Sequence, residues 1–237
     1  MVDFVLGYKA VLVIFLALSC LQGRPMQSAF DELSSLGVGI QLTPGNEPTR
    51  HFEAKVKASG VPFRTHHAFA FHARVAQVWR DDGACVIATD SVHPPKLQTS
   101  AAAHFDAWLE QHGGERVLET MYPGYRLGTG DELERAMSLG ITLAVDVSHL
   151  FIQRTAGVLS EGTLRRLFDY ERIAEVHVSM NDGRHDSHRL LRPNAFGLDW
   201  AKERTKYGLP LIHEAYLHRA SDDVRRAQLS LLREALA

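Results

Sequence analysis

One short segment of the chain concentrates side chains that are able to bind a metal ion. Residues 175–188, EVHVSMNDGRHDSH, begin as a strand with alternating apolar residues and then turn at Asn181-Asp182-Gly183. The candidate ligands at the strand end and in the loop are His177, Asp182, His185, Asp186 and His188. Imidazole and carboxylate together suit zinc, manganese, iron or cobalt better than calcium. The alternative is a polar surface loop with incidental histidines. Candidate ligands elsewhere in the chain are needed to distinguish the two interpretations.

The length, composition and charge limit the classes of protein to which the chain can belong. The chain has 237 residues, of which 45% are hydrophobic and 23% charged, as in ordinary globular proteins. This length suits one barrel-sized domain or two small ones, and we expect a single domain covering 1–237. The net charge of −2 shows no basic surplus, so nucleic acid is not an expected partner. Cys20 and Cys85 form no Cys-x-x-Cys pair, which argues against a thiolate metal site or a disulfide framework. The 13 histidines are about twice the number expected from average composition.

The apolar run AVLVIFLALSC at residues 10–20 has two interpretations. It resembles the apolar core of a signal peptide, and its last residues resemble a lipoprotein cleavage site, but it is too short to span a bilayer as a helix. We interpret it as a buried parallel strand at about 11–20, because Asp3 opposes the single charge of Lys9 and because removing the run would delete the first strand of the fold. We therefore expect a cytoplasmic protein without membrane contact.

The elements that position these residues alternate between strands and helices. Strands are expected at about 11–20, 38–42, 61–66, 85–92, 116–121, 141–147, 173–179 and 210–215. Helices are expected at about 24–36, 48–59, 69–79, 100–111, 131–139, 160–168, 196–206 and 221–236. Eight strand–helix units predict parallel strands with helical crossovers, and thus an α/β fold of the (β/α)8 TIM-barrel class. A doubly wound open sheet is the alternative, although no Gly-x-Gly-x-x-Gly motif follows any strand.

In such a barrel the carboxyl ends of all strands meet on one face, where the fold carries its chemistry. The titratable residues at or just after the predicted strand ends are His66 (with His67 beside it), His93, Glu119, Asp146, His149, His177, Asp186, His188 and Glu214. Each alone has a structural explanation, since a histidine at a strand end is more often hydrogen-bonded than metal-bound. Together they favour a metal site, because most follow apolar runs where an unpaired charge is costly.

With these motifs the chain resembles the xylose-isomerase-like TIM-barrel superfamily, which also contains endonuclease IV. The resemblance covers about 66–214 and is strongest in Asp146-x-x-His149, His177, Asp186-x-His188 and Glu214. Sugar epimerases of this group bind one divalent ion through two glutamates, an aspartate and a histidine, and the matching residues are Glu119, Asp146, His177 and Glu214, with His149 on the substrate side. Endonuclease IV has further ligands for three metals, and the residues in similar places are His66, His93, His149, Asp186 and His188.

The resemblance implies divalent metal ions (Zn, Mn or Fe), one to three per chain. The multinuclear non-haem iron oxidases of peptide natural-product pathways are similar to the same pattern. The chain also departs from it. Its first strand offers Ser19 and Cys20 in place of a histidine, residues 190–196 replace a typical Gly-Glu-Gly, and the basic stripe expected of a DNA-backbone binder is missing.

We expect a metal-dependent enzyme of the isomerase or epimerase type acting on a small polar metabolite. Glu119 and Glu214 would flank the substrate as base and acid, His149 would lie on the substrate side, and Arg184 would bind a substrate oxyanion. A multinuclear iron oxidase, for which a peptide is a candidate substrate, and a phosphodiester hydrolase resembling endonuclease IV are the alternatives. A metal-binding protein without catalytic activity is a fourth interpretation.

Overall fold

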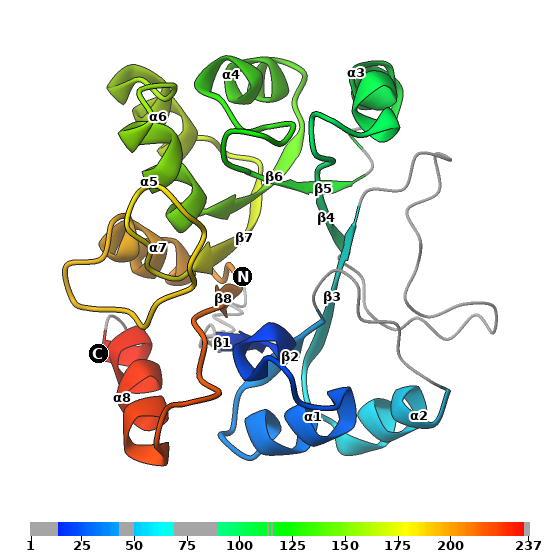
Figure 1. Ribbon diagram of the computed structural model, residues 1–237, viewed down its shortest axis with the longest axis vertical. Coiled ribbons are helices and arrows are strands. Elements are labelled where there is room, and N and C mark those ends of the chain that lie inside the picture. The colour runs from blue at the N-terminus through cyan, green and yellow to red at the C-terminus, as the bar shows by residue number, and fades with distance from the viewer. Residues whose placement is uncertain (1–13, 43–49, 69–89, 113, 115, 235–237) are drawn as a thin grey trace, which may run out of the picture.

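Eight parallel strands close into a barrel in which each strand pairs with its neighbours in sequence and β1 pairs with β8 (Figure 1). The computed structural model describes residues 14–42, 50–68, 90–112, 114 and 116–234. The order β1 to β8 around the barrel confirms the predicted (β/α)8 class and excludes the doubly wound alternative, whose sheet is open.

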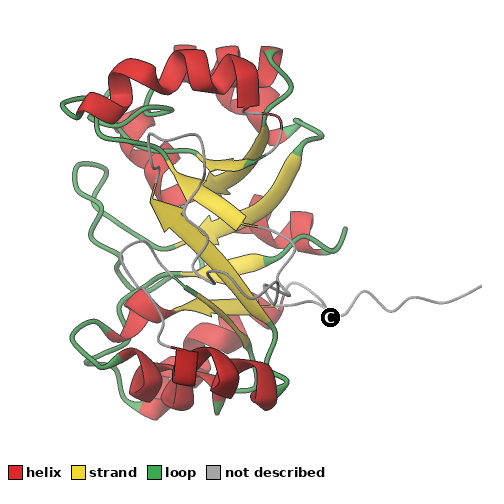
Figure 2. Cartoon of the chain, turned by 90° about the vertical axis from the view of Figure 1, so that its right-hand side faces the viewer, coloured by secondary structure: helices red, strands yellow, loops and turns green. Residues whose placement is uncertain are grey.

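The strands form the inner layer and the helices pack outside it (Figure 2). The strands are β1 (Ile14–Ala17), β2 (Gly39–Gln41), β3 (Phe63–Ala68), β4 (Asp90–His93), β5 (Val117–Glu119), β6 (Thr142–Asp146), β7 (Ile173–Val178) and β8 (Leu211–His213). The α-helices are α1 (Met26–Ser34), α2 (Arg50–Ser59), α3 (Ser100–His112), α4 (Gly130–Ser138), α5 (Val147–Thr155), α6 (Glu161–Phe168), α7 (Leu198–Thr205) and α8 (Asp222–Arg233). Among the described helices, none combines the length and apolar character needed to span a bilayer.

Two sequence predictions need correction. The first strand ends at Ala17, because Leu18–Leu21 turn into a short 3-10 helix, so the predicted strand at 11–20 is too long at its C-terminal end. Helix α5 was not predicted at all. The predicted helix at 69–79, the residues 85–89 of the predicted fourth strand and residues 11–13 of the first lie outside the described part of the chain.

Side-chain caps fix where several helices begin. Asp146 precedes α5 and accepts hydrogen bonds from the backbone N–H groups of Ser148 at 2.6 Å and His149 at 3.1 Å. Ser160 caps α6 in the same way through the N–H of Thr163 at 3.0 Å. Such caps satisfy N–H groups that have no partner within the helix. The cap at Asp146 therefore joins a strand directly to a helix.

The barrel interior combines an aromatic side chain of β1 with buried polar side chains from β2, β3 and β5 to β8. Phe15 is buried inside and lies so close to Gly39 that a Cβ there would be 2.4 Å from its ring, so β2 needs a glycine at this position. The guanidinium of Arg64 stands 5.4 Å from the centre of the same ring. On the other face of the strands, toward the helices, apolar residues such as Leu118, Leu143 and Val176 are fully buried. This core holds the strand ends rigidly in place.

Candidate metal centre

Four buried side chains from the ends of β5, β6, β7 and β8 converge at the mouth of the barrel. They are Glu119, Asp146, His177 and Glu214, and each offers a ligand atom within 4.8 Å of the others. His177 Nδ1 lies 3.4 Å from Glu119 Oε1 and 3.2 Å from Glu214 Oε1. The parallel register brings Asp146 directly opposite His177. The four residues supply the mixed imidazole and carboxylate set that zinc, manganese and iron accept.

Several atoms of this cluster are buried without a hydrogen-bond partner among the described residues. They are Glu119 Oε2, Asp146 Oδ2 and His177 Nδ1. Glu119 Oε2 does lie 3.1 Å from His66 Nε2, but not in hydrogen-bond alignment. Buried polar atoms almost always have partners, and burying them unpaired is costly. A divalent cation would satisfy these atoms, so the donor set fits a metal ion.

The charges of the cluster also favour a bound cation. Burial would raise the pKa of Glu119, yet the charges of His66 and His177 hold it well below its usual range. Burial would lower the pKa of His177, but Glu214 and Glu119 raise it well above its usual value. Burial raises the pKa of Asp146 to about 6. Three carboxylates in one buried site thus attract positive charge, which either protons on histidines or a bound cation can supply.

A second group lies next to the first, on the loop after β7. Asp186 Oδ2 stands 3.3 Å from His149 Nε2 and 3.1 Å from His188 Nε2. His149 donates its Nδ1–H to the carbonyl of Thr120 at 2.8 Å, which leaves Nε2 as a free ligand atom. His188 has the left-handed φ of 43°, which is unusual for a residue other than glycine. His149 Nε2, Asp186 Oδ1 and His188 Nδ1 also lack partners in the described structure, but the three side chains are not among the described groups whose ligand atoms all lie within 4.8 Å of one another.

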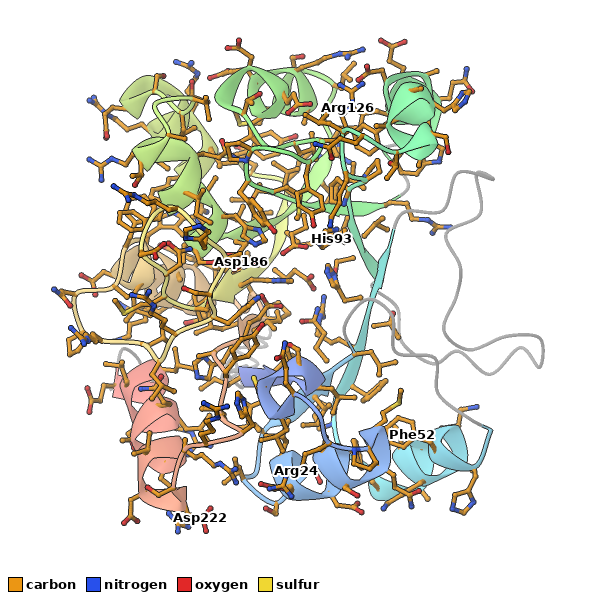
Figure 3. All side chains as sticks on the ribbon, in the orientation of Figure 1. Arg24, Phe52, His93, Arg126, Asp186 and Asp222 are labelled. Atoms are coloured by element: carbon orange, nitrogen blue, oxygen red, sulfur yellow. The ribbon has the colours of Figure 1, made fainter. Side chains whose placement is uncertain are left out.

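His66 of β3 and His93 of β4 lie in different surroundings. His66 is buried, contacts Glu119 as described, and hydrogen-bonds through Nδ1 with Ser91 Oγ at 2.7 Å. His93 is half-buried at the rim, with its ring centre 6.2 Å from that of His66. In Figure 3, His93 and Asp186 lie toward the middle of the ring of strands, whereas Asp222 lies at the periphery. The structure therefore brings His66 to the four-residue cluster and leaves His93 at its edge.

The comparisons with known proteins agree with this architecture. No protein-family model matches the chain, and a search of curated proteins finds no relative. Among solved structures, a Rhodospirillum rubrum protein provisionally named xylose isomerase is 13% identical, with 94% of this chain and 97% of that chain covered at a TM-score of 0.62. A D-tagatose 3-epimerase-like protein is 15% identical, with 95% and 100% covered at a TM-score of 0.55. The chain therefore shares the TIM-barrel fold of both structures.

Not every candidate residue joins the centre of the barrel. Arg184 is exposed on the loop after β7, and no contact described in the structure links its guanidinium to the buried cluster. Asp182 accepts hydrogen bonds from the N–H groups of Arg184 and His185, both at 3.0 Å, which folds the loop. His185 is 77% exposed. Asp182 and His185 thus shape the loop that carries Asp186.

Sequence reasoning missed a buried polar group below the cluster. Glu175 accepts a hydrogen bond from His177 Nε2 at 2.9 Å and is paired with Arg64 of β3. Gln41 of β2 also donates to Glu175, at 3.4 Å. The signal was present, because Glu175 precedes His177 by two residues in a strand and so points to the same, inward face. Glu175 lies within β7 and not at its end, so the pattern of strand-end residues does not include it.

Proposed function

We propose that this chain is a divalent-metal-dependent enzyme of the isomerase or epimerase type that acts on a small polar metabolite. The observation that carries the proposal is the convergence of Glu119, Asp146, His177 and Glu214 at the barrel mouth, with ligand atoms within 4.8 Å of one another. The names of the two matching structures agree with this class of reaction. Active sites of TIM barrels are built at this end of the strands.

In this proposal the four residues hold the cation, with zinc, manganese or iron as the candidates. A divalent ion held there would bind the carbonyl oxygen and the neighbouring hydroxyl oxygen of a substrate, and would acidify the proton on the hydroxyl-bearing carbon next to the carbonyl. Glu119 and Glu214 come from β5 and from the end of β8, and both approach His177, so they can stand on two sides of a bound substrate. One carboxylate takes the proton from carbon, and the other, in its protonated form, returns one.

His149 is the candidate for orienting the substrate. Its Nε2 is free of hydrogen bonds among the described residues while its Nδ1 is held by Thr120, so the ring is fixed and can offer Nε2 to a substrate oxygen. A cavity of about 360 Å³ lies between α5 and the loop after β7, but neither His149 nor the four-residue cluster lines it; its lining residues are Ser148, Phe151, Ser179, Met180, Asn181, Asn194 and Phe196. Arg184 remains a candidate oxyanion binder, provided that its exposed side chain turns inward when substrate binds.

The proposal is tested by hydrogen exchange at carbon. The metal-loaded protein is incubated in D2O with a panel of aldoses, ketoses and keto acids, and deuterium incorporation is followed by NMR. We expect one class of sugar to gain deuterium at the carbon next to its carbonyl, and Glu119→Gln to abolish this exchange by removing a carboxylate that moves the proton. A metal-loaded protein that exchanges no carbon-bound proton of any member of the panel would count against the isomerase-type proposal.

A second function is favoured by the group of Asp186, His149 and His188. With His66 beside the four-residue cluster and His93 at its edge, these side chains are the candidates for a second or third cation, as a multinuclear iron oxidase or a phosphodiester hydrolase would require. A small molecule or a peptide would be the substrate of the oxidase. Iron in the purified protein together with oxygen uptake would indicate the oxidase, and metal-dependent release of phosphate esters would indicate the hydrolase.

A further inference from the structure

A buried chain of hydrogen bonds lies behind His177, on the opposite side of its ring from the cluster. Glu175 Oε1 accepts from His177 Nε2 at 2.9 Å, and Glu175 Oε2 accepts from Arg64 Nε at 3.1 Å and from its Nη2. Glu175 and His177 have no exposed surface, and Arg64 is 8% exposed. Because an unpaired charge could not remain here, Arg64 balances the Glu175 carboxylate and fixes its orientation.

This arrangement gives the two ring nitrogens of His177 different roles. Nε2 carries a proton that it donates to Glu175, so Nδ1 is left facing Glu119 and Glu214 at 3.4 and 3.2 Å. We propose that Glu175 is a positioning residue that holds His177 in the orientation and tautomer in which Nδ1 binds a divalent cation, with Arg64 holding Glu175. This inference rests on the proposed metal centre and adds to it two residues that touch neither the substrate nor the cation.

A different role for Glu175 is less compatible with its contacts. His66, Glu175 and His177 also bring ligand atoms within 4.8 Å of one another and could form a cation site themselves. Both oxygens of Glu175 are already occupied, however, by His177 and Arg64. Glu175 therefore orients a ligand more readily than it serves as one.

The test uses two double variants that differ only in the hydrogen-bond acceptor. Arg64→Met/Glu175→Gln removes the buried charge pair but keeps an oxygen that can accept from His177, whereas Arg64→Met/Glu175→Leu removes the acceptor as well. Zn²⁺ affinity is measured by chelator competition for both variants and the wild type, and circular dichroism verifies folding. We expect the leucine variant to bind Zn²⁺ about 10- to 100-fold more weakly than the glutamine variant. Equal affinities, or loss of a whole zinc ion in the glutamine variant, would overturn the inference.

The ring protons of His177 provide a readout that does not depend on metal. In the metal-free wild type, ¹⁵N-edited NMR should show a slowly exchanging Nε2–H proton, which persists in the glutamine variant and is lost in the leucine variant. If the wild type lacks this proton, the inference fails even where zinc binds. If the proton is present but the wild type binds no divalent ion, the proposed function is contradicted. The positioning role of Glu175 is then contradicted as well, because it requires a cation at His177 Nδ1.

Discussion

The ligand atoms in the centre of this barrel are unusual because they are buried and yet unpartnered. An unsatisfied buried polar atom costs about 1–3 kcal/mol, and His177 Nδ1 and Asp146 Oδ2 are both of this kind in the described structure. Arg64 pairs with Glu175 rather than with the carboxylates of the cluster, so it does not offset their charge. A cluster of buried, unpartnered ligand atoms is less costly if a cation binds to the folded state, because the bound cation replaces the missing hydrogen bonds and stabilises that state.

At the residue scale, His188 separates the two candidate functions. The isomerase-type proposal needs one cation at the four-residue cluster, and we therefore expect His188→Ala to keep the metal content of the wild type, measured by elemental analysis. His185→Ala is the matched control, because His185 lies on the same loop but is 77% exposed. A loss of about one ion per chain in His188→Ala alone would show that Asp186 and His188 hold a second cation and would favour the oxidase or hydrolase.

At the element scale, Asp146 joins β6 to α5 and connects the centre to the barrel wall. Its Oδ1 caps the helix through the N–H groups of Ser148 and His149, while its Oδ2 remains without a hydrogen bond in the described structure. One carboxylate therefore begins a helix and also faces the proposed cation. This double use explains why the chain passes from strand to helix without a loop at this point.

The two uses of Asp146 can be separated by substitution. Asp146→Asn keeps an oxygen that caps α5, whereas Asp146→Ala removes the cap, and both remove the charge. We expect the alanine variant to have a free energy of unfolding lower than that of the asparagine variant by about 1 kcal/mol, measured by urea denaturation in excess chelator. Both variants should lose metal binding. Equal stabilities would mean that the cap contributes nothing to the folded state.

At the scale of the whole molecule, the eight-fold alternation of strands and helices was enough to predict the barrel and the convergence of its strand ends. Apolar periodicity identified α6, for example. It did not identify α5, since the run after Asp146 continues the apolar pattern of β6 and gives no turn signal. Nor could it identify the pairing of Glu175 with Arg64, because partners that lie 111 residues apart depend on how the barrel closes.

The central claim is that Glu119, Asp146, His177 and Glu214 together hold a divalent cation. Elemental analysis of protein purified without added metal, for the wild type and for Glu214→Gln, tests it most directly. The substitution removes one negative charge and one ligand oxygen at nearly constant volume, so we expect the wild type to carry at least about one divalent ion per chain and the variant to lose it. A wild-type protein that carries no divalent ion and takes up none on addition, or a Glu214→Gln variant that keeps its full complement, would contradict the claim.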